Sequence, residues 1–167
     1  MSYQEISPYD LHEGACKLIG RDWMLVTAGT PDQVNTMTAS WGGLGEMWGK
    51  PVAFVVIRPQ RYTKEFVDAQ DTMSLTFFSP QLRQELTYLG TASGRDEDKI
   101  AKAGLHVAFD GATPYFEEAE TILIAKKLYA SEYRAEDFLV PGLAKEMYPE
   151  DDFHTLYICE IQKVLVR

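Results

Sequence analysis

Hydroxyl side chains recur at every second position of one short segment: Thr36, Thr38 and Ser40. In a β-strand this spacing puts all three on one face, because successive side chains point to opposite faces. Hydroxyls grouped in this way can donate hydrogen bonds to a phosphate group. A solvated face of an ordinary strand is an equally good interpretation of the same spacing.

Two further segments combine arginine or lysine with a hydroxyl close to the expected start of a helix. They are Arg58, Arg61 and Thr63, and Ser93, Gly94, Arg95 and Lys99. Free backbone N–H groups and the helix dipole favour an anion at such a position. The structural alternative is a capped helix with surface arginines in the first segment, and a Ser93 cap facing Asp96 in the second. Because the chain is acidic overall, basic residues gathered near helix starts favour a phosphate site.

Aromatic side chains and glycines follow the hydroxyl segment directly. Trp41 and Trp48 could cover a planar ring, and the glycines between them let backbone N–H groups approach a ligand closely. These glycines are Gly42, Gly43 and Gly45. Asn35, just before the hydroxyls, could hydrogen-bond such a ring. The same residues also suit a structural role, with the tryptophans as core or interface anchors and the glycines and Asn35 at turns.

Residues for hydrolytic or metal chemistry are not grouped in the sequence. His12, His106 and His154 show no H-E-x-x-H or other metal-binding spacing, and no G-x-S-x-G nucleophile motif occurs. Cys16 and Cys159 form no C-x-x-C pair, and we expect reduced thiols, with Cys159 in the core. Ligand-binding groups without an evident nucleophile or metal site suggest that a bound cofactor does the chemistry.

The overall composition is that of an acidic globular protein. The 167 residues include 25 acidic and 16 basic side chains, for a net charge of −9, and 46% are hydrophobic. Nucleic-acid and anionic-membrane binders need clustered Lys and Arg, so this balance argues against both. No apolar run approaches the roughly 20 residues that span a bilayer, and the first residues do not resemble a signal peptide. We therefore expect one cytoplasmic domain over residues 1–167.

The apolar patterns that must position these residues predict mostly β-strands. The strands are expected at residues 22–30, 35–41, 51–58, 72–78, 106–109, 120–133 and 154–166. Residues 42–45 are expected to break regular structure because three of them are glycines. No G-x-G-x-x-G follows a strand, which argues against a Rossmann domain. The fold class indicated is mainly β, a β-barrel with inserted helices.

Helices are expected at three places between the strands. Thr63 and Ser79 are the expected N-caps of the first two, and the third enters through residues 90–98 and stops at Gly104. Residues 134–150 suggest a short helix or excursion. The acidic runs in residues 96–98 and 150–152 are expected on solvated faces or at helix caps.

Five motifs in this order resemble the flavin reductase-like family, within it the flavoredoxin-like branch. They are N-T-M-T-A-S-W-G-G from residue 35, W-x-K-P from 48, R-P-x-R-Y-T from 58, S-G-R-D-x-D-K from 93 and F-H-T-L-Y-I-C-E-I from 153. The resemblance extends over residues 23–164. It implies an FMN-binding split β-barrel that forms a homodimer, with the flavin near the subunit interface.

The resemblance also assigns cofactor-binding positions, residue by residue. The isoalloxazine and ribityl chain would be lined by Asn35, Thr36, Met37, Thr38, Ala39, Ser40 and Trp41. The phosphate and its surroundings would be contacted by Arg58, Arg61, Tyr62, Thr63, Ser93, Gly94 and Lys99. His154 matches a histidine often found near the ring, although a structural histidine is the simpler interpretation. A glycine is common in the family where Cys159 stands.

These observations support an FMN-binding flavoprotein that uses electrons from NAD(P)H, as a flavin reductase or as a flavoredoxin-like electron-transfer protein. Its expected partners are FMN, NAD(P)H or a redox partner protein, and a second copy of the chain. The alternative is a non-catalytic FMN-binding module or flavin carrier that acts through a protein partner. A barrel without cofactor is a third possibility. The sequence assigns no catalytic residue and no metal.

Overall fold

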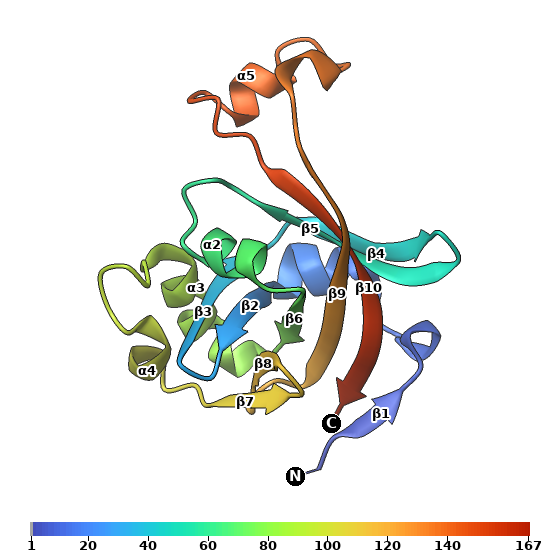
Figure 1. Ribbon diagram of the computed structural model, residues 1–167, viewed down its shortest axis with the longest axis vertical. Helices are drawn as coiled ribbons and strands as arrows, with labels where there is room; N and C mark the ends of the chain where they lie inside the picture. The colour runs from blue at the N-terminus through green and yellow to red at the C-terminus, as the bar shows by residue number, and fades with distance from the viewer. Residues whose placement is uncertain (1) are drawn as a thin grey trace.

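An antiparallel sheet forms the body of the molecule, with strand order β3-β2-β6-β9-β10-β5-β4 and with β1 paired to β10. The computed structural model describes residues 2–167, and Figure 1 shows how the sheet curves. The strands of this sheet are β1 Gln4–Ile6, β2 Met24–Thr30, β3 Gln33–Ala39, β4 Gly42–Met47, β5 Lys50–Ile57, β6 Thr72–Phe77, β9 Thr121–Glu132 and β10 Thr155–Val166. A separate hairpin consists of β7 Val107–Asp110 and β8 Thr113–Phe116.

Short helices connect the strands. The α-helices are α1 Ala15–Lys17, α2 Thr63–Ala69, α3 Arg83–Thr91, α4 Lys99–Ala103 and α5 Leu143–Met147. Single turns of other helix types occur at Pro8–Asp10, Leu18–Asp22, Pro80–Leu82 and Ala135–Asp137. The predicted fold class, mainly β with inserted helices, is confirmed. Within residues 2–167 no helix is long and apolar enough to cross a bilayer.

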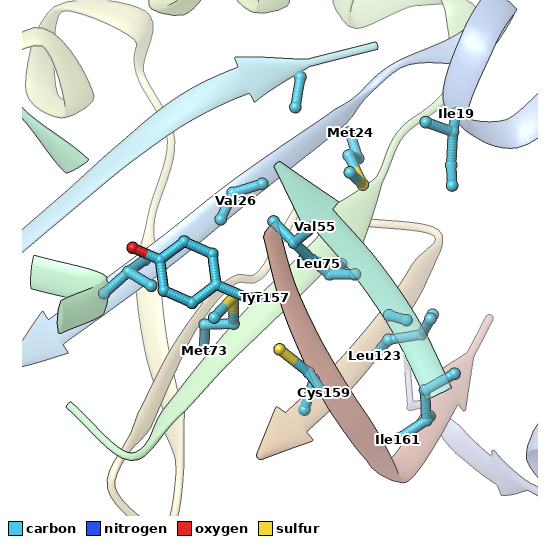
Figure 2. Close-up of a cluster of buried hydrophobic side chains, with 14 of the residues drawn as sticks. Ile19, Met24, Val26, Val55, Met73, Leu75, Leu123, Tyr157, Cys159 and Ile161 are labelled. Atoms are coloured by element: carbon cyan, nitrogen blue, oxygen red, sulfur yellow. The ribbon is translucent and has the colours of Figure 1, made fainter. Parts of the chain in front are cut away.

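One hydrophobic cluster fills the inside of the curved sheet. Met37 of β3 and Val55 of β5 belong to it, although their strands lie far apart in the strand order, so the sheet must curl around the cluster. Figure 2 shows Val55 in this cluster together with Tyr157 and Cys159 of β10. Cys159 is fully buried and unpaired, as predicted, and burial raises the pKa of its thiol to about 12. A second cluster, on the other face, packs α3 and β8 against β2 and β9.

The glycine-rich residues after β3 form a strand, so the predicted break in regular structure is wrong. β4 pairs with β5, with Gly42 opposite Val55 and Gly43 opposite Phe54. A Cβ on Gly42 would lie 2.4 Å from the Phe54 carbonyl oxygen, and its φ is +143°. Glycine is therefore required by the close approach of the neighbouring strand, a long-range contact that local propensity does not reveal.

One expected helix start also differs from the structure. Residues before α2 already form turns, with the Arg61 N–H donating to the Arg58 carbonyl at 3.1 Å, so Thr63 is the first helical residue and not the N-cap. The third helix begins at Lys99, after the loop expected over residues 90–98, and the Asp98 side chain caps it by accepting from the Ala101 N–H at 3.0 Å. Its predicted end at Gly104 is confirmed by the left-handed φ of +69°.

The excursion expected at residues 134–150 is confirmed. β9 and β10 extend beyond the rest of the sheet and carry residues 133–154 between them, which we call the arm (Figure 1). The arm contains α5 and ends where His154 meets β10. Its tip is apolar and open to solvent, with Leu139 93% exposed and Val140 60% exposed.

Candidate functional site

A groove of about 460 Å³ lies where the start of β3, the start of α2 and the loop between α3 and α4 meet. It is lined by Asp32, Gln33, Val34, Asn35, Tyr62, Phe66, Gly94, Arg95, Asp96, Glu97, Asp98, Lys99 and Ile100. The predicted residues Asn35, Tyr62, Gly94 and Lys99 therefore meet at one place, although they come from three separate segments of the chain.

A buried hydrogen bond fixes the floor of this groove. The Asn35 side chain donates from Nδ2 to Thr63 Oγ1 at 3.0 Å, and the two residues are 4% and 1% exposed. Gly94 packs against the same amide, since a Cβ at this position would lie 2.3 Å from Asn35 Oδ1 and 3.2 Å from the Tyr62 ring. The loop backbone can approach β3 this closely only because Gly94 has no side chain.

Aromatic and cationic groups form one wall of the groove. The Arg95 guanidinium lies 4.6 Å from the centre of the Tyr62 ring, and Phe66 meets this ring edge-on at 5.0 Å. The Tyr62 hydroxyl accepts from Gln33 Nε2 at 3.2 Å. Arg95 also donates to the Gln60 carbonyl at 3.2 Å and pairs with an exposed carboxylate, that of Glu65.

Two cations beside the groove are bound only by carbonyl groups. Lys99 is 4% exposed, and its Nζ donates to the carbonyls of Leu89 at 3.0 Å and Ala92 at 2.9 Å. Arg61 donates to the carbonyls of Gly90 at 2.7 Å and Thr38 at 3.3 Å. Neither side chain has an ion pair with a carboxylate in residues 2–167.

The charge of these cations is costly in the absence of an anion. Burial and, second, the charge of Arg61 lower the pKa of Lys99 to about 8, and burial also lowers the pKa of Arg61. An ammonium has three N–H donors and Lys99 uses two on carbonyls, so one is left for an external acceptor. A phosphate group would supply the missing negative charge.

The hydroxyls that recur along β3 do not form the predicted donor face. Thr36 is fully buried, and its Oγ1 lies 2.8 Å from Thr27 Oγ1 and 3.1 Å from the Val26 carbonyl. Thr38 donates to the Leu86 carbonyl of α3 at 2.5 Å. A solvated strand face is equally wrong, because α3 covers this side of β3. Ser40 lies just after the strand end and is half-buried.

Met37 and Ala39 point to the inner side of the barrel, where both belong to the first hydrophobic cluster. Only their backbone is open to a role in ligand binding. Ser93 is half-buried in the loop beside the groove, and its Oγ accepts from the Arg95 N–H at 3.2 Å. This contact replaces the expected cap toward Asp96.

A second group of the predicted residues gathers where the arm joins the barrel. The Trp41 ring lies 5.3 Å from the His154 ring, centre to centre. Arg58 is not in the groove, because its guanidinium forms an ion pair with Asp152 and donates to the Met147 carbonyl at 2.9 Å. The solvated position expected for residues 150–152 is therefore wrong for Asp152, whose carboxylate also accepts from Gln60 at 2.7 Å.

The segment of residues 58–62 joins the two groups. Arg58 and Gln60 contact Asp152 at the base of the arm, while Tyr62 lines the groove and Arg61 donates to the Gly90 carbonyl of α3. The groove end of this segment offers cations that suit an anion. The end at the arm offers the flat ring of Trp41, which is 44% exposed and lies beside His154. No group of three or more residues that could hold a metal ion occurs within residues 2–167.

One contact that sequence reasoning missed is that of Tyr148 with His154. Its hydroxyl lies 2.8 Å from His154 Nδ1, and the residue is 4% exposed. The pairing is between residues six apart in an irregular segment, so no helical or strand periodicity points to it. The only feature of the sequence that could have suggested this contact is the number of aromatic residues in the arm.

Comparison with known proteins identifies the family. The flavin reductase like domain matches residues 17–167. The chain belongs to this family. No curated protein matches the chain. The predicted split β-barrel fold is thereby confirmed along with the family resemblance.

Solved structures of this fold include three that are named for flavin binding or flavoredoxin. An FMN-binding domain of a flavin reductases-like enzyme from Shewanella baltica shares 17% identity, with a TM-score of 0.71, over 99% of this chain and 77% of that one. A flavoredoxin from Methanosarcina acetivorans shares 18% identity, with a TM-score of 0.70, over 87% and 68%. A flavoredoxin of Desulfovibrio vulgaris shares 24% identity, with a TM-score of 0.67, over 87% and 69%.

Proposed function

We propose that this protein is an FMN-binding flavoprotein that takes electrons from NAD(P)H or from a redox partner, as a flavin reductase or a flavoredoxin-like protein. The observation that carries the proposal is the pair of cations beside the groove, Lys99 and Arg61, which are bound only by carbonyls. Together with membership of a flavin-binding family, this uncompensated charge favours the phosphate of FMN over an uncharged flavin.

The residues present fit this cofactor in chemistry. Lys99 and Arg61 would hold the phosphate, and the loop that Gly94 brings against Asn35 would lie beside it. Asn35, fixed by Thr63, offers its amide to the polar part of the ligand. Trp41 and His154 would lie toward the ring. Bound FMN would supply the redox chemistry, while the chain binds, orients and partly desolvates it.

We further propose that the active form is a homodimer of single domains spanning residues 1–167. Large apolar side chains lie exposed on β9, on the β4–β5 turn and on the arm: Trp48, Leu128, Tyr129, Leu139, Val140 and Leu143. Such side chains commonly mark protein interfaces. We also propose a cytoplasmic location, in keeping with the free thiols of Cys16 and Cys159.

The alternative is a flavin carrier whose output is a protein contact. The carrier and the reductase would share the same cofactor site, so both predict bound FMN. They differ in the source of the electrons. The two flavoredoxins among the structural relatives keep this alternative open.

A visible absorption spectrum tests the proposal directly. The purified protein is incubated with FMN, freed of unbound ligand and then mixed with NADH or NADPH without oxygen. We expect a flavin band that bleaches on addition of one nicotinamide. A band that persists would support the carrier alternative, and the absence of any band would contradict both forms of the proposal.

A further inference from the structure

The two ring nitrogens of His154 have different surroundings. Nδ1 lies 2.8 Å from the hydroxyl of Tyr148. Nε2 has no hydrogen-bond partner in the part of the chain that the structure describes, and it is not among the side-chain atoms that are sealed from solvent without a partner. Nδ1 is thus hydrogen-bonded to the arm, whereas Nε2 is free to hydrogen-bond a ligand.

The tyrosine is the donor in this contact. Its hydroxyl has no other hydrogen-bond partner within residues 2–167, and the side chain is 4% exposed. If Nδ1 carried the proton, the Tyr148 O–H would be left without an acceptor, which costs free energy at a buried position. Burial also raises the pKa of Tyr148, so the hydroxyl keeps its proton at neutral pH. Nδ1 is therefore the acceptor, and the proton of the neutral ring lies on Nε2.

The ring is neutral under ordinary conditions. Burial and, second, the charge of Arg58 lower the pKa of His154 to about 4, against a smaller opposite effect of Asp152. The titratable groups that face this ring are Arg58, Asp152 and Tyr148, while Trp41 packs on it without charge. A neutral N–H donor suits a carbonyl oxygen better than a phosphate, because it brings no charge to the contact.

Tyr148 is itself held in place from several sides. The Arg58 guanidinium lies 4.9 Å from the centre of its ring, and the Phe153 ring lies at 4.9 Å. Arg58 also binds the Met147 carbonyl next to Tyr148 in the chain. These contacts explain why Arg58 lies outside the groove, because its guanidinium binds the arm at Met147 and Tyr148.

We propose that Tyr148 is a positioning residue that holds the His154 imidazole so that Nε2–H donates a hydrogen bond to a carbonyl oxygen of a molecule bound beside Trp41. The proposal rests on the proposed function, which gives two sources for that oxygen. One is a ring carbonyl of the flavin, and the other is the carboxamide of a nicotinamide donor. The arm would then act on the redox site through one hydrogen bond.

Nuclear magnetic resonance of the imidazole nitrogens tests the positioning role without any flavin. We expect the flavin-free wild type to show His154 with its proton on Nε2 over the neutral pH range. In Tyr148→Phe the proton should distribute over both nitrogens. Tyr133→Phe is the control, since Tyr133 lies in the same aromatic group and its hydroxyl makes no hydrogen bond within residues 2–167. A proton on Nδ1 in the wild type, or an unchanged tautomer in Tyr148→Phe, would overturn the proposal.

Ligand measurements on the same variants identify the source of the oxygen. If His154 binds the flavin ring, Tyr148→Phe should weaken FMN and riboflavin alike, by roughly three- to tenfold. If it binds the nicotinamide, the same variant should raise the KM for NADH by a similar factor and leave FMN affinity unchanged. A change of tautomer that affects neither quantity would overturn the ligand contact. A wild type that binds no flavin would contradict the proposed function, while the tautomer still decides the role of Tyr148.

Discussion

Lys99 keeps a positive charge at a position that is almost closed to water, and this has a measurable consequence for stability. Its pKa is lowered to about 8 in the folded chain, against 10.5 for the free side chain. Between these values the unfolded chain holds the proton and the folded chain releases it, so the free energy of unfolding rises as pH increases through this window. Below it the charged Lys99 lowers the stability of the flavin-free protein. A bound phosphate would remove this penalty.

The charge of Lys99 predicts a pH-dependent preference for FMN over riboflavin. We expect FMN to bind on the order of tenfold or more tightly than riboflavin at about pH 6.5, and this ratio to fall at about pH 9.5, where Lys99 is neutral. Lys99→Ala should have a low ratio at both pH values, whereas Lys126→Ala, at an exposed position on β9, should behave like the wild type. Dissociation constants measured by flavin fluorescence check this. A ratio that Lys99→Ala leaves unchanged would exclude Lys99 from the phosphate site.

At the scale of elements, the groove depends on how closely the loop between α3 and α4 packs on β3. Lys99, the first residue of α4, binds carbonyls at and after the end of α3, which fixes the two helices relative to each other. Gly94 then brings the intervening loop against Asn35. The site is therefore built from contacts between three elements, and a small displacement of the loop should affect ligand binding before it affects the fold.

We predict that Gly94→Ala weakens FMN binding by about tenfold and lowers the melting temperature by several degrees, without preventing folding. The new methyl group would lie 2.3 Å from Asn35 Oδ1, so either the loop or the amide must move, at a cost of roughly 1–3 kcal/mol. Gly20→Ala is the matched control, since a Cβ there meets no atom within 4 Å. Titration with FMN and thermal melts distinguish the two effects. Wild-type affinity in Gly94→Ala would show that the loop does not touch the ligand.

At the scale of the whole molecule, the arm is the part with the least support from the barrel. It extends from the sheet on β9 and β10 (Figure 1), and an aromatic group at its base includes Phe138, Tyr148 and Phe153. The exposed apolar tip contributes nothing to the core of this chain. A second copy of the chain is the partner that we propose for it, which would also enclose the nearby Trp41 and His154 more fully.

We predict that the protein sediments as a particle of roughly twice the chain mass of 18.9 kDa. Leu139→Asp combined with Val140→Asp should shift the equilibrium between dimer and monomer toward the monomer. Each substitution replaces an exposed apolar side chain of the arm with a charged one, which is costly to bury in an interface. Gln81→Asp, at an exposed site outside the arm, is the control and should remain dimeric. Sedimentation velocity over a range of concentrations provides the measurement. A monomeric wild type, or a double variant that stays dimeric, would contradict an interface at the arm.

Local patterns in the sequence were sufficient for most of the strands. β5, β6, β9 and β10 begin and end within one residue of the predicted ranges, because their apolar runs and alternations are strong. The motifs also indicated the family, and they singled out Lys99 and Arg61, since basic residues near helix starts stand out in an acidic chain. The N-cap at Thr63 was predicted wrongly, because a capping pattern also fits a turn that precedes the helix.

Only the tertiary structure decided which of the predicted residues meet. Thr36 and Thr38 turn to neighbouring elements because α3 covers their face, and Arg58 turns to the arm because Asp152 and Tyr148 lie there. Sequence spacing determines which side chains share a strand face. It does not determine what packs on that face, because the packing depends on contacts between residues far apart in the chain. For the same reason the sequence does not predict the hydrogen bond between Tyr148 and His154, which forms because the arm folds back toward the barrel.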